Sequence, residues 1–328
     1  MKILLTGAEG FIGSHLLDKL SKIKNINIDC SILHNTNNSY GNINTNLLKK
    51  KNIKFFFCDL TDSGFVNNLI NKNKYDYILN LASLISVPLS FDLPNTFFKN
   101  NIEIAHNLLN SCRSSKNIKK IFFFSSSEVY GSAKNLPITE KHPLQPQSPY
   151  AASKIAVDSL VLSYWYSYKL PVTIIRPFNC YGPKQSQRAV IPAIINQFLS
   201  KKKLIKLGTT STFRDYTLVY DLVKIIEKLL FMETKLSGEV INIGTSKYFQ
   251  IKDIVSLVSK ITKKNKRIIL DKQRKRPNKS EIDRLLCDNT KLLKIIGNYK
   301  FTSFVVGLKQ TINYQKKILK SNNDNYHK

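Results

Sequence analysis

Apolar and polar residues alternate along the first half of the chain in blocks of two kinds. Short apolar runs rich in Ile, Leu and Phe are followed by longer amphipathic stretches. This alternation predicts βα units and a parallel sheet covered by helices on both faces, an α/β doubly wound fold. The expected strands are Lys2–Thr6, Ile26–Leu33, Ile53–Cys58, Tyr75–Leu81, Lys119–Ser125 and Val172–Arg176. The expected helices are Phe11–Ile23, Gly64–Asn71, Pro94–Ser115 and Tyr150–Tyr168.

The pattern changes after Gly182-Pro183, where the segments become shorter. We expect further short elements at Ala189–Ser200, Lys203–Leu207 and Asp221–Met232. The polar stretch Ser321–Lys328 has few groups to pack and is expected to be frayed.

Three glycines follow the first expected strand at once, in Gly7-Ala-Glu-Gly10-Phe-Ile-Gly13. Glycines at a strand-to-helix turn allow a pyrophosphate to approach the backbone closely, and the helix N-terminus supplies N–H donors. The spacing differs from the Gly-x-Gly-x-x-Gly of most dehydrogenases, and an ordinary glycine-rich turn is the alternative. The strand before it and the amphipathic stretch after it favour a dinucleotide site.

Tyr150 and Lys154 lie four residues apart in Ser148-Pro-Tyr-Ala-Ala-Ser-Lys154. If Pro149 opens a helix, both side chains lie on one face. A lysine cation favours the phenolate, so we expect the pKa of Tyr150 to be low enough for a base near neutrality. Tyr-x-x-x-Lys also arises by chance, so the other motifs decide its meaning.

Together these motifs resemble the extended short-chain dehydrogenases/reductases, in particular the NAD-dependent sugar-nucleotide epimerases and dehydratases. The resemblance covers nearly the whole chain in family order. It rests on Gly7, Gly10, Gly13, Asp59-Leu60, Asn80-Leu-Ala82, Asn101, Ser125-Ser-Ser-Glu-Val-Tyr-Gly131, Tyr150, Lys154, Arg176-Pro-Phe-Asn179-Cys-Tyr-Gly-Pro183, Arg214-Asp215 and Arg276-Pro277.

The resemblance implies a Rossmann-like dinucleotide domain over 1–180 together with about 213–243, in which Glu239–Ile243 returns to the main sheet. The segments 181–212 and 244–328 would form a smaller nucleotide-sugar-binding lobe. In related enzymes the two long helices Pro94–Ser115 and Tyr150–Tyr168 form a four-helix dimer interface, so a homodimer is expected. Core packing is the alternative explanation of their apolar content.

The resemblance also assigns catalytic roles at the end of the fifth strand. Ser126 would hydrogen-bond the reacting oxygen, and Tyr150 would remove the proton of the 4-hydroxyl while a hydride leaves C4. Lys154 would hold the cofactor ribose, and Asn101 would order the helix and water next to this lysine. The carboxyl ends of parallel strands face the ligand crevice, which suits this position.

Glu128 separates the possible reactions. A 4-epimerase typically carries a neutral residue there, whereas a carboxylate can abstract the acidic C5 proton of a 4-keto sugar, so that water leaves and the hydride returns to C6. Ser127 beside it resembles GDP-mannose and N-acetylhexosamine 4,6-dehydratases, and the stretch around Tyr150 most resembles GlcNAc-nucleotide dehydratases of the legionaminic-acid type. We therefore predict a 4,6-dehydratase acting on GDP- or UDP-GlcNAc for surface polysaccharide biosynthesis. The alternative is an epimerase or a glucuronate decarboxylase.

The remaining site residues follow from the same resemblance. The expected cofactor contacts are Gly7, Gly10, Phe11, Ile12, Gly13, His34, Asp59, Leu60, Leu81, Ala82, Ser83, Asn101, Tyr150 and Lys154. The expected substrate contacts are Ser86, Asn179, Arg188, Arg214 and Arg276. NAD is the expected cofactor, but Ile32-Leu33-His34-Asn35-Thr36 has neither the acid typical of NAD sites nor the arginine of NADP sites, so NADP stays open.

The composition of the chain indicates its partners and its cellular location. The net charge of +29 could indicate nucleic-acid binding, but the lysines are spread among asparagines throughout the chain, without a recognition motif. Five scattered cysteines have no metal-ligand spacing and indicate reduced thiols. No apolar run approaches a membrane span, and the N-terminus leads directly into the first strand, without a secretion signal. We expect a cytoplasmic enzyme with no metal, no nucleic-acid partner and no membrane partner.

Overall fold

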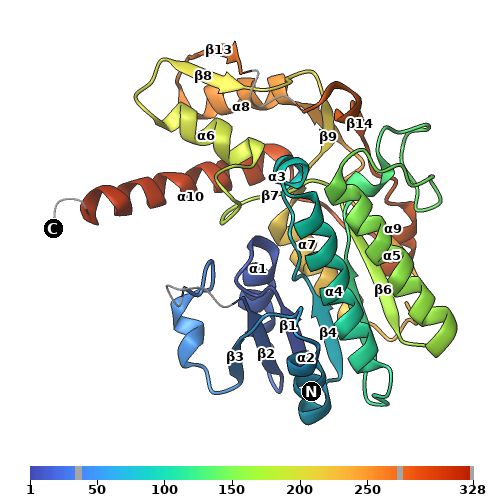
Figure 1. Ribbon diagram of the computed structural model, residues 1–328. Helices are drawn as coiled ribbons and strands as arrows, with labels where there is room; N and C mark the ends of the chain where they lie inside the picture. The colour runs from blue at the N-terminus through green and yellow to red at the C-terminus, as the bar shows by residue number, and fades with distance from the viewer. Residues whose placement is uncertain (34–38, 272–275, 326–328) are drawn as a thin grey trace.

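The computed structural model of the protein describes residues 1–33, 39–271 and 276–325. Its centre is a parallel sheet of seven strands in the order β11-β6-β5-β4-β1-β2-β3 (Figure 1). The strands are β1 Lys2–Thr6, β2 Asn27–Ile32, β3 Ile53–Phe57, β4 Tyr77–Asn80, β5 Lys120–Phe124, β6 Val172–Pro177 and β11 Val240–Ile243. Strand order reverses between β1 and β4, the place where doubly wound folds bind ligands. The predicted sheet and its late seventh strand are confirmed.

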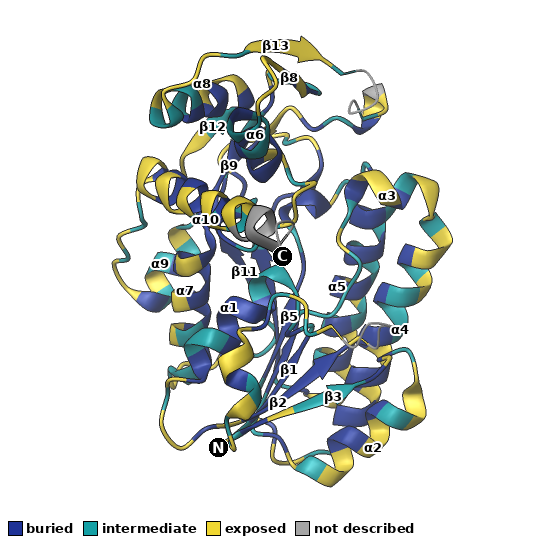
Figure 2. Ribbon diagram, turned by 90° about the vertical axis from the view of Figure 1, so that its left-hand side faces the viewer, coloured by how far each residue is buried: buried dark blue, intermediate teal, exposed yellow. Residues whose placement is uncertain are grey.

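Helices cover both faces of this sheet, and each face has its own hydrophobic cluster (Figures 1 and 2). Successive side chains of β1 alternate between the faces: Ile3 and Leu5 belong to one cluster and Leu4 to the other. The first cluster includes α1 Phe11–Leu20, α7 Val219–Phe231 and α9 Thr290–Ile296. The second includes α2 Ser63–Asn73, α4 Pro94–Cys112 and α5 Pro149–Tyr168.

A second lobe lies beyond the carboxyl ends of the strands (Figure 1). One apolar cluster joins its helices α6 Val190–Leu199, α8 Ile251–Thr262 and α10 Phe304–Asn325 to strand β8 Leu204–Leu207. β8 pairs in parallel with β13 Arg267–Leu270. A separate three-stranded sheet has the order β12-β9-β14; its strands are β12 Tyr248–Gln250, β9 Phe213–Asp215 and β14 Arg284–Leu285. β9 thus lies outside the seven-stranded sheet, although it falls in the segment 213–243; the domain division itself stays a prediction.

Short elements complete the fold. They are α3 Val87–Asp92, β7 Cys180–Tyr181, β10 Thr217–Leu218 and the 3-10 turns η1 Thr45–Lys49, η2 Ser127–Tyr130 and η4 Asn278–Ser280. The expected frayed C-terminus is corrected over its first part, because α10 runs on to Asn325. No helix in the described ranges is both long and apolar enough to cross a bilayer.

Candidate active site

The first turn of α5 presents the tyrosine–lysine pair. Ser148 caps the helix by accepting a hydrogen bond from the N–H of Ala151 at 3.1 Å, and Pro149 is the first helical residue, as the sequence predicts. Tyr150 and Lys154 are both buried, on one face of the helix. The Lys154 ammonium donates to Ser83 Oγ and to the carbonyl of Phe124, each at 2.9 Å.

The pKa values in this pair differ from the sequence-based expectation. Burial raises the pKa of Tyr150 above its ordinary value, opposed by a hydrogen bond with Ser126 and increased further by the charges of Glu128 and Asp158. Burial lowers the pKa of Lys154 itself to about 8, against the attraction of Asp158. The expected low pKa of Tyr150 is therefore not found, because desolvation of the buried phenol dominates.

The end of β5 brings the predicted serines and glutamate to the same place. Ser126 caps η2 by accepting from the N–H of Glu128 at 3.2 Å, so its hydroxyl lies between the strand end and Tyr150. Ser127 is buried in this turn. The Glu128 charge acts on the Tyr150 hydroxyl, so the two groups predicted to act on one sugar lie near each other.

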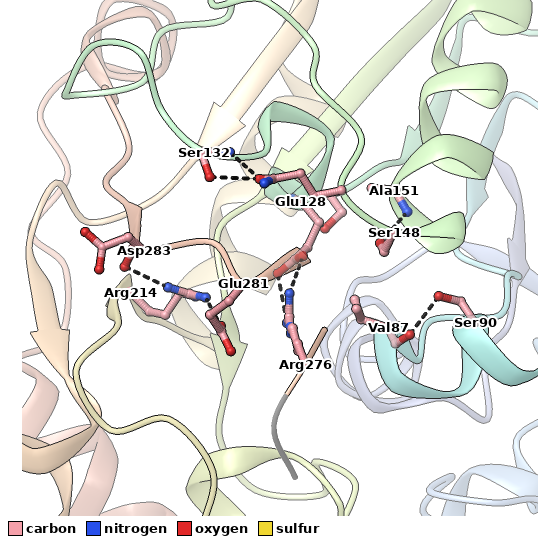
Figure 3. Close-up of polar contacts among 12 residues, drawn as sticks. Val87, Ser90, Glu128, Ser132, Ser148, Ala151, Arg214, Arg276, Glu281 and Asp283 are labelled. Atoms are coloured by element: carbon pink, nitrogen blue, oxygen red, sulfur yellow. Dashed lines mark hydrogen bonds and ion pairs between the residues drawn. The ribbon is translucent and has the colours of Figure 1, made fainter. Parts of the chain in front are cut away.

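Two arginines of the second lobe lie on this side of the site: Arg276 contacts Glu128, and Arg214 pairs with Glu281 at 3.6 Å (Figure 3). Arg276 donates to both carboxylate oxygens of Glu128, with Nη1–Oε2 at 3.0 Å and Nη2–Oε1 at 3.3 Å. This bidentate contact joins residues 148 positions apart and raises the pKa of Arg276 against the effect of burial. Arg214 in β9 donates to the carbonyls of Phe213 and Asp283, and burial lowers its pKa, partly opposed by Glu128.

A buried polar network behind the catalytic residues was missed by the sequence analysis. Asp158 Oδ2 accepts from Ser125 Oγ at 2.9 Å and from Arg176 Nε at 3.0 Å, and Arg176 Nη2 lies 2.9 Å from the same oxygen. Arg176 Nη1 also donates to the Tyr130 hydroxyl at 2.9 Å, which in turn donates to Asn242 Oδ1 at 2.7 Å. The network ties α5, η2, β6 and β11 together. Asp158 follows Lys154 by one helical turn, and this spacing could have revealed it.

The glycine turn is closely packed against the loop after β4. Gly7 has φ +63°, and a Cβ there would lie 3.0 Å from the amide nitrogen of Ala82; a Cβ on Gly13 would lie 2.1 Å from the Gly7 carbonyl oxygen. Thr6 Oγ1 accepts from the N–H groups of Leu81 and Ala82 and donates to Asn80. Phe11 and Ile12 pack beside the core at the start of α1. The predicted glycine and β4 residues thus lie together.

Asn101 acts on the same loop through hydrogen bonds. Its oxygen accepts from the N–H of Leu84 at 2.7 Å, and its Nδ2 donates to the Leu84 carbonyl and to Ser153 Oγ at 3.0 Å. Asn101 therefore fastens the loop that contains Ser83 to α5, next to Lys154.

A second turn follows β3. Asp59 Oδ1 accepts from the N–H and the hydroxyl of Thr61, while Leu60 is buried in the core. Asn107 of α4 donates to the carbonyls of Leu60 and Thr61 and so fixes this turn, a role that the sequence did not reveal.

The remaining predicted residues differ in their surroundings. Ser86 caps α3 by accepting from Leu89 N–H. Asn179 Nδ2 is buried without a hydrogen-bond partner among the described residues, so this donor is available to a bound ligand. Arg188 is exposed before α6, and its side chain makes no hydrogen bond or ion pair with the described parts of the chain. His34 lies outside the described residues.

Fold and site together define an extended short-chain dehydrogenase/reductase of the epimerase/dehydratase class. A sequence profile of the GDP-mannose 4,6 dehydratase family matches residues 4–311. The chain belongs to this family.

Known relatives agree with this assignment. A dTDP-D-glucose 4,6-dehydratase of Dictyostelium discoideum is 38% identical over 267 residues, covering 77% of this chain and 60% of that protein. A trifunctional UDP-glucose 4,6-dehydratase/UDP-4-keto-6-deoxy-D-glucose 3,5-epimerase/UDP-4-keto-L-rhamnose-reductase of Arabidopsis thaliana is 31% identical over 323 residues, covering 95% of this chain and 46% of that protein. The chain therefore spans less than two thirds of the length of the first relative and about half of the length of the second.

Solved structures show the same architecture. UDP-glucuronic acid 4-epimerase from Bacillus cereus, in complex with UDP-glucuronic acid and NAD, superposes with a TM-score of 0.88 at 28% identity, covering 97% of this chain and 100% of that one. dTDP-glucose 4,6-dehydratase from Bacillus anthracis, in complex with NAD, gives 0.85 at 26% identity and covers 97% of both chains.

Proposed function

We propose that the protein is an NAD-dependent nucleotide-sugar 4,6-dehydratase, a hydro-lyase. The observation that carries this proposal is the Glu128 carboxylate at the end of β5, near the Tyr150 hydroxyl and in contact with Arg276. An epimerase needs only oxidation and reduction at C4, whereas a dehydratase needs a base for the C5 proton.

The glycine turn supports NAD as the cofactor. A Cβ on Gly13 would collide with the Gly7 carbonyl oxygen, and one on Gly7 would be strained by the positive φ of +63° and crowded by Ala82, so the turn requires glycine as a pyrophosphate-binding turn does. Lys154 and Ser83 would hold the ribose next to the nicotinamide, and Asp59 would bind the adenine. NAD, when bound, supplies a reversible hydride acceptor for the sugar.

The chain's own residues then divide the proton transfers among them. Tyr150 takes the proton of the 4-hydroxyl, and Ser126, which shares a hydrogen bond with Tyr150, binds the same substrate oxygen. Glu128 removes the C5 proton, and Ser127 in the same turn assists the departure of the 6-hydroxyl as water. Asn101 keeps the Ser83 loop and α5 in register during these steps.

The contact between Glu128 and Arg276 suggests that the substrate diphosphate also controls whether Glu128 is free to act as a base. A guanidinium that binds both oxygens of a carboxylate can bind a phosphate in the same way. We infer that the substrate diphosphate draws Arg276 away from Glu128 and so releases the base only when a nucleotide-sugar is bound. Arg214 and Asn179 would bind the same diphosphate–sugar unit, with Arg188 at its edge.

The substrate proposed is a GDP- or UDP-GlcNAc-like sugar, on the resemblance around Tyr150 and Ser127. The named relatives act on dTDP-glucose and UDP-glucose, so these belong in the same test. Epimerisation is the second candidate, because the UDP-glucuronic acid 4-epimerase superposes closely; decarboxylation of a glucuronate is the third.

Mass spectrometry of the products separates these reactions. Purified protein with NAD is incubated with dTDP-glucose, UDP-glucose, UDP-GlcNAc, GDP-GlcNAc, GDP-mannose and UDP-glucuronic acid. Dehydration lowers the product mass by one water, decarboxylation releases carbon dioxide, and epimerisation leaves the mass unchanged. Loss of water from none of these sugars, with epimerisation of one, would replace the proposal by the second candidate.

Glu128→Gln tests the residue that carries the proposal. We expect NAD affinity to be unchanged and dehydration to fall by about a hundredfold or more, because the C5 base is lost. The nucleoside diphosphate should bind at least as tightly as to wild type, because the carboxylate no longer competes for Arg276. Glu233→Gln, the same change at an exposed position after α7, is the control. Full turnover by Glu128→Gln would contradict the assigned role.

Three further parts of the proposal concern assembly and setting. A homodimer would form through the outer faces of α4 and α5, where Tyr166 and Tyr168 are exposed; light scattering of the purified protein measures the mass. A cytoplasmic location is proposed from the composition, and a role in surface polysaccharide biosynthesis from the family resemblance alone.

A further inference from the structure

The carboxyl end of β2 lacks the side chain that normally selects NAD. Sites for NAD carry an Asp or Glu there, which accepts a hydrogen bond from the 2′-hydroxyl of the adenosine ribose. In this chain, the residues from Cys30 to Asn42 include no Asp and no Glu. The strand ends at Ile32 and is followed by Leu33.

Glu9 of the glycine turn lies at this position instead. Its Oε1 accepts a hydrogen bond from the N–H of Leu33 at 2.9 Å, which fixes the carboxylate at the end of β2. The Glu9 carbonyl accepts from Asn42 N–H at 3.0 Å, and Gly41 packs so closely that a Cβ there would lie 3.0 Å from Glu9 Cβ. The side chain is thus held between the turn after β1 and the segment after β2.

The Glu9 carboxylate also affects a residue at the end of the neighbouring strand, β3. Burial, and after it the charge of Glu9, raises the pKa of Cys58 to about 12. Cys58 directly follows β3, the neighbour of β2 in the sheet, and precedes Asp59. The Glu9 charge therefore lies where the ends of β1, β2 and β3 meet, the edge at which an adenosine would bind.

One oxygen of Glu9 has no donor. Oε2 is buried and has no hydrogen-bond partner among the described residues, whereas Oε1 is satisfied by Leu33. A buried carboxylate oxygen without a partner is costly, so such an atom in a binding site indicates a donor on the ligand.

We propose that Glu9 replaces the missing acid of β2: its Oε2 accepts from the adenosine 2′-hydroxyl of NAD, and its charge repels the 2′-phosphate of NADP. This inference rests on the proposed dinucleotide function. It assigns cofactor selection to a residue of the glycine turn, between the first and second glycines of the motif, rather than to the end of β2.

Calorimetric binding to nucleotide-free protein tests the assignment with NAD, 2′-deoxy-NAD and NADP. Wild type is expected to bind NAD about tenfold to a hundredfold more tightly than 2′-deoxy-NAD, the range of a hydrogen bond to a charged group. In Glu9→Ala this ratio falls to about one, because the acceptor is gone. In Glu9→Gln the affinity for NADP rises about tenfold, because an uncharged amide no longer repels phosphate.

Glu227→Gln provides the matched control, since this glutamate of α7 pairs with Lys19 away from the turn; it should keep the wild-type ratios. Thermal unfolding establishes that each variant is folded. Wild type that binds NAD, 2′-deoxy-NAD and NADP equally overturns the inference without any variant and leaves the proposed function standing. Wild type that binds no dinucleotide overturns both.

Discussion

Replacing Lys154 by methionine should change stability in a direction that depends on pH. Lys154 is 4% exposed, and its ammonium donates two hydrogen bonds, to Ser83 and to the Phe124 carbonyl. Burial lowers its pKa from 10.5 in an unfolded chain to about 8. The folded protein therefore bears a cost for keeping this side chain charged at neutral pH, which methionine, of similar length, does not have.

The size of the effect follows from the shift. One pKa unit corresponds to about 1.4 kcal/mol, so holding the charged form costs about 3 kcal/mol at pH 7. Between the folded and unfolded pKa values the unfolded chain binds more protons, so the free energy of unfolding of wild type rises with pH, by about 2 kcal/mol up to pH 9.5. Loss of the hydrogen bonds costs the variant about 2 kcal/mol at every pH. Lys154→Met should be about 1 kcal/mol more stable than wild type at pH 7 and about 1 kcal/mol less stable at pH 9.5, with the sign changing between pH 8 and 9.

Urea unfolding followed by circular dichroism at pH 7, 8, 9 and 9.5 measures this difference, on proteins whose absorbance shows no bound nucleotide. Lys99→Met, the same change at an exposed position of α4, is the control and should differ from wild type by a constant amount. The variant should also be inactive. A difference between wild type and Lys154→Met that does not change with pH would refute the lowered pKa.

Two further predictions concern the framework of the site. Arg176→Met leaves Asp158 buried without its cation and should lower the free energy of unfolding by about 3–5 kcal/mol. The double variant Asp158→Asn/Arg176→Met should lose less stability than Asp158→Asn and Arg176→Met lose in sum. Additive losses in urea titrations would show that the pair is not coupled. Gly13→Ala places a Cβ 2.1 Å from the Gly7 carbonyl oxygen and should weaken NAD binding by about tenfold to a hundredfold. Gly64→Ala in α2, where the nearest atom is 3.3 Å away, should bind NAD as wild type does, and equal affinities for both variants would count against a tight cradle.

Elements with a clear hydrophobic period were predicted well, because burial on one or both faces decides them. The strands of the main sheet and the start of α5 at Pro149 agree with the structure to within a few residues. Helix α8 was overlooked although its buried residues Ile251, Ile254, Val255 and Val258 follow a helical period. Its Gln250–Asp253 capping box would have marked its first turn.

The sequence identified the residues of the site but not the contacts between them. Glu128 and Arg276 were each assigned a role from their motifs, yet 148 residues separate them, and no local pattern indicates that they meet. The pKa of Tyr150 was misjudged because spacing along a helix shows which side chains share a face, but not how much water surrounds them. Glu9 was invisible for a related reason: its role depends on the end of β2 packing against the glycine turn.

Burial separates the functional charges from the many others in this basic chain. Of 51 lysines and arginines, the buried ones in the described part of the chain are Lys154, Arg176 and Arg214, and all three belong to the candidate site or to the network behind it. Burying a cation is costly unless it is paired, so composition drift, which adds lysines wherever water can solvate them, does not place them there. The net charge of +29 is thus a property of the solvated surface. The chemistry belongs to a few buried cations: Arg176 is paired with Asp158 and stabilises the framework, whereas Lys154 is retained at a cost in stability, so its removal should separate stability from activity.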